Sequence, residues 1–447
     1  MPGSLSPSPS LWGGGGETDL AAWLAHLETR NVNAIVLGLE RVRVVADRLG
    51  LTRDTRRRGV DPDFPLITVG GTNGKGSVCA FLEAMLDAAG YRVGCYTSPH
   101  LLRYNERVRI AGGEAGDTDL CRAMAAVESA RGDIPLTYFE QGTLAAMWLF
   151  QEADLDVAVL EVGLGGRLDA VNLWDADCAV VVSVDLDHQA FLGDTRELIG
   201  FEKAGIYRGG HAAICGDPNP PASLLGHAAD IGADLLRLGM DIRVEAGEEG
   251  WACRVRGAAF PALPRPAMPG AHQLGNAACA IAALHSLRER LPVPMRAIRA
   301  GLAAARQPGR FQVVGQAPLR ILDVAHNPHA ARALAANLAD LPPNGRVHAV
   351  FAMLADKDMD GVIAPLAPHV DYWHVAGLSG PRGLAGAALA GHLAAHSLEY
   401  RVYADVATAW QAACRLAGPA DTIAAFGSFH TVAEVMAATA LSTNPHG

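Results

Sequence analysis

Several features typical of other protein classes are missing from this 447-residue chain. No apolar run is long enough to span a bilayer. The eight cysteines include no C-x-x-C pair, and such scattered cysteines in a long chain indicate reduced core residues rather than a zinc site or a disulfide framework. Basic residues are outnumbered, 37 Lys and Arg against 47 Asp and Glu, for a formal net charge of -10. This balance argues against a nucleic acid or an anionic membrane as the partner.

The start of the chain also lacks a targeting signal. Residues 1–18 are rich in Ser, Pro and Gly and have neither a basic start nor an apolar segment, so we expect a flexible leader. Elsewhere the composition is that of a globular protein, with 50% hydrophobic and 19% charged residues overall. The length suggests two domains. We therefore expect a cytoplasmic, monomeric enzyme that acts on small molecules.

Short apolar runs alternate with helical patterns along the chain. The runs at 66–69, 91–96, 157–162 and 179–184 are typical of buried strands in a parallel sheet. After residues 304–309, a plausible linker, the alternation restarts with strands at 319–324, 347–353 and 422–426. This order predicts an α/β fold with a larger N-terminal domain, residues 19–307, and a smaller C-terminal domain, residues 308–447.

A glycine-rich loop follows the first predicted strand. Residues 70–77 read Gly-Gly-Thr-Asn-Gly-Lys-Gly-Ser and lead into a helical pattern. In such a loop the backbone N–H groups, the helix N-terminus and the lysine bind phosphate oxygens. The spacing departs from the usual G-x-x-x-x-G-K-[ST], because Gly76 separates Lys75 from Ser77. The flanking strand and helix nevertheless favour a phosphate site over an ordinary glycine turn.

Polar side chains follow other strands at the same expected sheet edge. Glu161 lies at the end of one strand, and Asp185, Asp187 and His188 follow another. Ligands of open α/β sheets bind at the carboxyl ends of the strands, and Mg²⁺ prefers carboxylate and phosphate oxygens. Singly, these residues would be caps, surface charges or a structural histidine. Lys203, on a helical pattern further on, would by default be a solvated cation.

Two motifs of the second half resemble these in placement. Asp323 and His326 follow the strand at 319–324, and Ser428 follows the strand at 422–426. Either motif alone would favour capping or turn chemistry. Together they suggest that the second domain also faces a ligand at the edge of its sheet.

The chain resembles the bacterial dihydrofolate synthase/folylpolyglutamate synthase family of the Mur ligase superfamily. The motifs that carry the resemblance are residues 71–77, 97–101, 160–167, 202–206, 323–328 and 427–430. It implies a Mur-ligase-like P-loop domain with a mostly parallel sheet and a smaller Rossmann-like C-terminal domain. It also implies that the γ-phosphate of ATP is transferred to a substrate carboxylate, and that L-glutamate attacks the acyl phosphate. The expected carboxylate substrates are dihydropteroate, which becomes dihydrofolate, and folates, which are polyglutamylated.

The resemblance further implies a set of site residues. Those expected to bind ATP are Thr72, Asn73, Gly74, Lys75, Gly76, Ser77, Asn276, Arg310 and Asp323. Those expected to bind Mg²⁺, as two ions, are Ser98, Glu161, His188 and Lys203. Lys203 is expected as a carbamylated lysine, because carbamylation converts a cation into an anion that can lie beside a metal. The residues expected to act in catalysis are Lys75, Lys203, Asp169, His326 and Ser428.

A pterin site is implied as well. The residues expected to contact the pterin are Ile35, Leu37, Thr137, Tyr138, Phe139, Glu140, Leu168, Asp169 and Ala170. Phe139 would supply an aromatic face and Glu140 a carboxylate for a flat, hydrogen-bonding heterocycle.

Three functions remain open at this point. The chain is a bifunctional ligase, a folylpolyglutamate synthase without the first activity, or a Mur-like nucleotide-binding module that has lost catalysis. The segments at 35–42 and 137–140 favour the first. They also disfavour a Mur-type ligase of peptidoglycan precursors, which would not explain them. The retention of Lys75, Glu161 and Lys203 argues against an inactive module.

Overall fold

The computed structural model describes residues 19–30, 36–52, 64–342 and 345–443. The predicted leader and Ile35 of the predicted pterin site lie outside these residues. The chain forms two compact units, described separately below. The first comprises the described parts of residues 1–98, 104–242 and 279–301, and the second those of 99–103, 243–278 and 302–447. The predicted single boundary at residue 308 stays a prediction.

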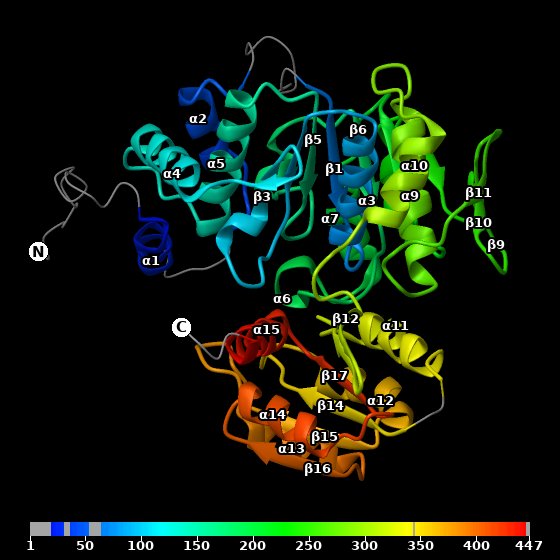
Figure 1. The fold of residues 1–447 in the computed structure, drawn as a ribbon. Helices are drawn as coiled ribbons and strands as arrows, with labels where there is room; N and C mark the ends of the chain where they lie inside the picture. Colours follow the sequence, from blue (N-terminus) through cyan, green and yellow to red (C-terminus); the bar gives the residue numbers. More distant parts are fainter. Residues whose placement is uncertain (1–18, 31–35, 53–63, 343–344, 444–447) are drawn as a thin grey trace, which may run out of the picture. The chain divides into compact units, whose positions relative to one another are not determined.

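An eight-stranded, mostly parallel sheet forms the centre of the first unit (Figure 1), with the strand order β4-β3-β2-β5-β1-β6-β7-β8. The strands are β1 (Leu66–Gly70), β2 (Val93–Tyr96), β3 (Val108–Ile110), β4 (Gly113–Glu114), β5 (Val157–Glu161), β6 (Cys178–Val181), β7 (Ala212–Cys215) and β8 (Asp234–Arg237). Every residue of β1, β2, β5 and β6 is buried, as in sheets covered on both faces. Only β3 and β4, at one edge, pair antiparallel.

The following helices belong wholly or partly to this unit. They are α1 (Leu20–Arg30), α2 (Glu40–Arg48), α3 (Lys75–Ala88), α4 (Asp117–Arg131), α5 (Tyr138–Glu152), α6 (Gln189–Leu192), α7 (Arg196–Ala204), α8 (Ala222–Asp230), α9 (His272–Ser286) and α10 (Met295–Ala304), with short 3-10 turns at η3 (Tyr104–Arg107) and η4 (Ala170–Leu173). Helix α4 packs against α1, α2 and α5, and their apolar faces share one core with Trp23, Phe150 and Trp174. The division between the units falls within α9 and near the end of α10.

The second unit has a six-stranded sheet, ordered β12-β13-β17-β14-β15-β16. Its strands are β12 (Gln312–Gln316), β13 (Leu319–Leu322), β14 (Val347–Phe351), β15 (Tyr372–Ala376), β16 (Tyr400–Tyr403) and β17 (Thr422–Phe426). All pairs are parallel except β12 with β13. The helices are α11 (Pro328–Ala339), α12 (Met359–Leu366), α13 (Gly386–Ala395), α14 (Val406–Leu416) and α15 (Phe429–Thr443), with η5 (Ala367–His369).

Separate apolar cores lie on the two faces of this sheet. One contains residues of α11, α12 and α13, and the other contains residues of α14 and α15. A mostly parallel sheet with helices on both faces is the predicted Rossmann-like arrangement.

One small sheet was not predicted. Strands β9 (Ile242–Ala246), β10 (Trp251–Val255) and β11 (Ala258–Leu263) form it, and β10 pairs antiparallel with β11. Alternate residues of β10 are buried, which is the pattern of a half-exposed strand. Among the described residues, none of the helices has both the length and the hydropathy of a membrane span.

Candidate active site

The glycine-rich loop lies at the carboxyl end of β1 and turns sharply into α3. Gly71 and Gly74 have φ values of 142° and 86°, which L side chains rarely adopt. A Cβ at Gly71 would also lie 3.1 Å from backbone atoms of Val182 and Ser183. No side chain caps the N-terminus of α3, which starts at Lys75. Because the first N–H groups of a helix have no intrahelical acceptor, this helix start can bind an anion.

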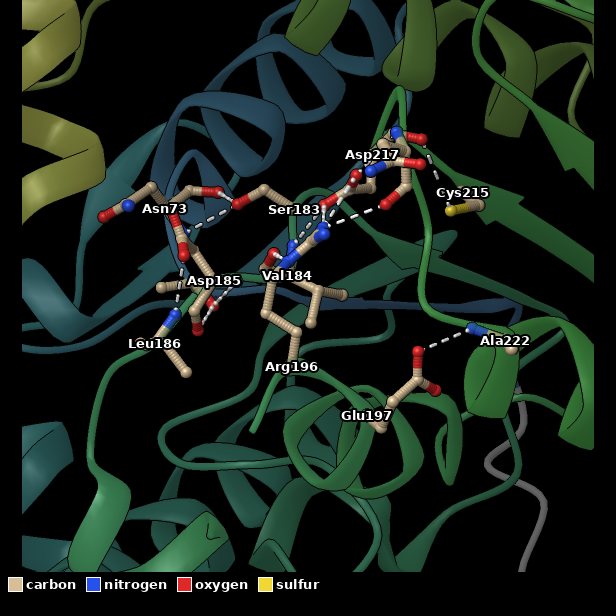
Figure 2. Close-up of polar contacts among 12 residues, drawn as sticks. Asn73, Ser183, Val184, Asp185, Leu186, Arg196, Glu197, Cys215, Asp217 and Ala222 are labelled. Carbon is tan, nitrogen blue, oxygen red and sulfur yellow. Dashed lines mark hydrogen bonds and ion pairs between the residues drawn. The ribbon is translucent and has the colours of Figure 1, made fainter. Parts of the chain in front are cut away.

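Two loop residues are bound by the segment that follows β6. The Thr72 N–H donates to the Ser183 carbonyl at 2.8 Å, and the Asn73 N–H donates to the Ser183 hydroxyl at 3.0 Å. The Ser183 hydroxyl donates in turn to the Asn73 carbonyl at 3.0 Å (Figure 2). The Thr72 hydroxyl bonds to both the N–H and the carbonyl of Asp185, at 3.0 and 3.1 Å. These bonds shape the loop and engage the Thr72 and Asn73 N–H groups within the protein.

Lys203 is buried, so the reading of this residue as a solvated cation is wrong. It lies on α7 and is only 4% exposed. Burial and the positive charge of Lys75 lower the pKa of Lys203 to about 7, while Asp187 and Asp169 act in the opposite direction. The ammonium of Lys75 donates to the carbonyls of Gly71 and Thr72, at 3.0 and 3.3 Å. The structure thus brings the predicted Lys75 and Lys203 into one electrostatic neighbourhood.

Asp169 belongs to the same neighbourhood. Its carboxylate accepts the N–H groups of Leu164 and Val171, at 2.8 and 3.1 Å, and caps η4. Burial raises the pKa of Asp169 to about 7, against these hydrogen bonds and the charge of Lys75. Two buried groups of opposite type, Asp169 and Lys203, therefore both titrate near neutral pH, which is common at functional sites.

The predicted metal ligands come from three strand ends. Glu161 ends β5 and is buried, and its Oε2 accepts the Ser98 N–H at 3.1 Å. His188 has a left-handed φ of 52° in the loop that follows β6, and its N–H donates to Asp187 at 2.8 Å. In the described part of the chain no three His, Cys, Asp or Glu side chains form a metal cluster. The predicted set has only two such residues, so a cation there would also need the Ser98 hydroxyl, phosphate oxygens or a modified Lys203.

The described residues of the predicted pterin site lie near one another. The Gly38 N–H, next to Leu37, donates to the Leu168 carbonyl at 3.3 Å. Phe139 packs against Tyr96, with ring centroids 5.9 Å apart. A Cβ at Gly163 would lie 2.6 Å from the Phe139 ring, so glycine allows this approach. Tyr138 instead packs edge-on against another tyrosine, with centroids 6.0 Å apart, and Ala170 is buried.

Glu140 is engaged within the protein. It forms a capping box with Thr137 at the start of α5: the Thr137 N–H donates to Glu140 Oε2 at 2.7 Å, and the Glu140 N–H donates to the Thr137 hydroxyl at 3.2 Å. Its other oxygen pairs with Arg41 at 2.7 Å. This carboxylate therefore fixes the helix start, a role that the sequence analysis did not foresee.

In the second unit, Arg310 and Asp323 lie beside the end of β13. Asp323 accepts the N–H groups of Phe311 and Ala325, both at 2.8 Å. Burial raises the pKa of Asp323, while Arg310 lowers it. The guanidinium of Arg310 also lies 5.6 Å from the centre of the Phe429 ring. The structure therefore groups two of the predicted ATP contacts.

His326, Asn276 and Ser428 are fixed by their neighbours. His326 Nδ1 lies 2.7 Å from the Val324 carbonyl and donates to it. Asn276 donates to Gln273 at 3.0 Å. The Ser428 hydroxyl accepts the N–H of Thr431 at 3.0 Å and lies 2.7 Å from its hydroxyl, which donates to the Ala352 carbonyl at 2.7 Å. Ser428 thus has the geometry of an N-cap of α15.

Three comparisons place the chain among known proteins. A model of the Mur ligase glutamate ligase domain matches residues 309–429. The dihydrofolate synthase/folylpolyglutamate synthase of Escherichia coli K12 is 49% identical over 417 residues, 93% of this chain and 94% of that protein. The chain belongs to the dihydrofolate synthase/folylpolyglutamate synthase family. Its relative in Haemophilus influenzae is 40% identical over 94% of this chain and 97% of its own length.

Solved structures of this family agree with the fold. Escherichia coli FolC in complex with DHPP and ADP has a TM-score of 0.89 and 48% identity, over 95% of this chain and 98% of that one. A bifunctional folylpolyglutamate synthase/dihydrofolate synthase with Mn, AMPPNP and L-glutamate bound has a TM-score of 0.86 and 50% identity, over 94% of this chain and 98% of that one. The predicted Mur-ligase fold and enzyme class are confirmed: this family member is an ATP-dependent ligase.

Proposed function

We propose that this member of the family is bifunctional. It joins L-glutamate to dihydropteroate, giving dihydrofolate, and adds further glutamate to the γ-carboxyl of folates. Both reactions convert a carboxylate, which is a poor electrophile, into an acyl phosphate with phosphate as the leaving group. The relatives named for both activities, 49% and 40% identical over nearly the whole chain, support the two reactions. The observation that carries the ligase chemistry is Lys203, buried on α7.

Nucleotide phosphates bind at the start of α3 in this proposal. The N–H groups of residues 74–77 and the ammonium of Lys75 donate to the phosphate oxygens, while Ser183 fixes the loop through its bonds to Thr72 and Asn73. Preorganised donors of this kind stabilise the charge of a transferring phosphoryl group. Asn276, Arg310 and Asp323 remain proposed ATP-binding residues.

Ser98, Glu161, His188 and carbamylated Lys203 would hold divalent cations, two Mg²⁺ ions in this proposal. The buried, hydrogen-bonded Glu161 suits such a cation because hard cations prefer carboxylate oxygens. Mg²⁺ neutralises phosphate charge when bound. A lysine with a pKa near 7 is largely neutral at about pH 8. Its amine can therefore form an N–C bond with CO2 and lose a proton, which leaves a carbamate anion.

The pterin binds against Phe139, Leu37, Leu168 and Asp169. Phe139 supplies an aromatic face. Glu140 acts through the helix start that it caps, together with Arg41, rather than as a free acceptor for the heterocycle. Ile35, which lies outside the described residues, remains part of the proposed site.

The glutamate step involves the second unit. His326 is the proposed general base, an imidazole that takes a proton from the attacking amine. Ser428 contributes through its position at the start of α15, and Asp169 remains a further proposed catalytic residue. That the enzyme acts as a cytoplasmic monomer on small-molecule substrates alone belongs to the same proposal.

The test offers the purified protein ATP, Mg²⁺ and L-glutamate with either dihydropteroate or tetrahydrofolate. Phosphate release is expected with both substrates, together with products that are one glutamate heavier. Release with tetrahydrofolate alone would reduce the function to folylpolyglutamate synthase. Release with neither would indicate a module without ligase activity.

A further inference from the structure

The backbone of residues 183–185 is bound on two sides (Figure 2). One side bonds to the glycine-rich loop through Ser183 and Asp185, as described above. On the other side, the Val184 N–H donates to Asp217 Oδ2 at 2.7 Å, and the Val184 carbonyl accepts from Arg196 Nε at 2.9 Å. Both polar groups of Val184 are therefore bound by a pair of side chains that lie away from the loop.

Arg196 and Asp217 also bind each other. Arg196 Nη2 lies 3.2 and 3.3 Å from the two carboxylate oxygens of Asp217 and donates to the Asn219 carbonyl at 2.9 Å. The Asn219 N–H donates to Asp217 Oδ1 at 2.8 Å. Asp217 is buried, 5% exposed, just after β7. The Asp217 carboxylate holds its donors firmly, because hydrogen bonds to a charged group are stronger than those between neutral groups. Several such bonds converge on this one side chain, so they fix one another's geometry.

The pair connects three parts of the proposed site. It fixes Val184, whose neighbours shape the phosphate loop. The same segment continues to His188, a proposed metal ligand. Arg196 is the first residue of α7, the helix that carries Lys203.

We propose that Arg196 and Asp217 are positioning residues for nucleotide and metal binding, acting through Val184 without touching either ligand. The inference rests on the proposed nucleotide site. Residues 182–185 belong to no helix or strand. Two backbone bonds, from Val182 to Gly70 and from Thr72 to Ser183, hold the segment on the side of the loop, while the side chains of Asp217 and Arg196 bind both polar groups of Val184. Removal of Asp217 leaves the Val184 N–H without its carboxylate and Arg196 without its counter-charge. The phosphate loop then loses support, and nucleotide binding has to order it again.

The experiment compares Asp217→Ala, Arg196→Ala and the double variant with Glu197→Gln as the control. Glu197 is adjacent to Arg196, but its carboxylate accepts the N–H groups of Ala222 and Ser223 at the start of α8, at 3.1 and 2.7 Å. The Kd values for AMPPNP with Mg²⁺ and for dihydropteroate alone are measured by calorimetry. All measurements use the full chain, at a temperature where thermal unfolding shows every variant to be folded.

Each single variant of the pair is expected to raise the nucleotide Kd about tenfold, and the double variant no further, since the two residues act as one unit. The dihydropteroate Kd, and both Kd values of the control, should stay within about twofold. An unchanged nucleotide Kd in the folded variants, with a lower Tm only, would overturn the inference.

Two milder variants keep the test decisive if the alanine variants do not fold. Asp217→Asn retains an oxygen for Val184, and Arg196→Lys lacks the fork that reaches several acceptors at once. Each should raise the nucleotide Kd about threefold, and no rise in either would refute the positioning role. If the wild-type chain itself bound dihydropteroate but no nucleotide, the proposed nucleotide site would be wrong. The positioning role of Arg196 and Asp217 would then be wrong as well.

Discussion

Replacement of Lys203 by methionine should abolish ligation and, at the same time, stabilise the unliganded fold. Methionine has nearly the length of lysine but no charge, so it can occupy the buried site without a desolvation cost. In the wild-type chain, burial and the charge of Lys75 lower the pKa of Lys203 from 10.5 to about 7. The folded state therefore disfavours the ammonium form.

The size of the effect depends on pH. Between about pH 7 and 10.5 the unfolded chain binds a proton at this lysine that the folded chain does not, so the stability contributed by this group rises with pH across that window. The cost of burying the amine is on the order of several kcal/mol at pH 7 and falls to a small part of that by pH 9.5. Lys203→Met should recover up to these amounts.

Chemical denaturation at both pH values, in bicarbonate-free buffer, measures the difference. Bicarbonate is left out because carbamylation would convert the wild-type lysine into an anion and change its effect on stability. The variant should be the more stable protein at pH 7, and the gap should narrow at pH 9.5. A variant that is less stable, or a gap that does not change with pH, would show that burial does not lower the pKa of Lys203.

The turnover of Lys203 variants tests whether this residue takes part in the reaction. Turnover should fall by more than about a hundredfold in Lys203→Met. Lys203→Ala should be similarly impaired, but small carboxylates such as formate should partly restore it by replacing the carbamate. Unimpaired turnover in either variant would place Lys203 outside the chemistry.

Three further substitutions test other parts of the site. Gly71→Ala should weaken AMPPNP binding by at least about tenfold in calorimetry, because its φ of 142° and its close neighbours exclude a side chain; equal affinity would contradict the loop geometry. In steady-state kinetics, Arg41→Ala should raise the KM for dihydropteroate about fivefold and leave the KM for ATP unchanged, because Glu140 loses its ion pair. An equal rise in the two KM values would refute this role of Arg41. Ser428→Ala should cost about 1 kcal/mol of unfolding free energy through the lost cap of α15. A large fall in kcat at unchanged stability would instead give this hydroxyl a catalytic role.

The central strands could be predicted because they are buried on both faces. A buried parallel strand is a continuous apolar run, so β5 and β17 stand out in the sequence, and the predicted bounds of β17 match the structure. The half-exposed β10 gives no such run, because only alternate residues are buried. The two-residue β4 is too short to show any period.

The site was predictable where the functional residues and the turn that holds them lie within a few residues of one another, as in the glycine-rich loop. The side chains that support this loop from distant parts of the chain were not predictable. Ser183 lies 110 residues from Asn73, and Asp217 lies 33 residues from Val184, and neither belongs to a short motif. The burial of Lys203 was missed because helical spacing gives the face of a residue but not what covers it. Glu140 was assigned to the pterin because composition does not reveal that Arg41 and Thr137 already engage it.

The formation of an acyl phosphate is the central chemical claim, and oxygen transfer tests it most directly. Dihydropteroate labelled with ¹⁸O in its carboxylate is incubated with the enzyme, ATP, Mg²⁺ and L-glutamate, and the released phosphate is analysed by mass spectrometry. If the carboxylate attacks the γ-phosphate, one labelled oxygen leaves with the phosphate as the amide forms. Phosphate that contains no ¹⁸O, released alongside dihydrofolate, would contradict the account.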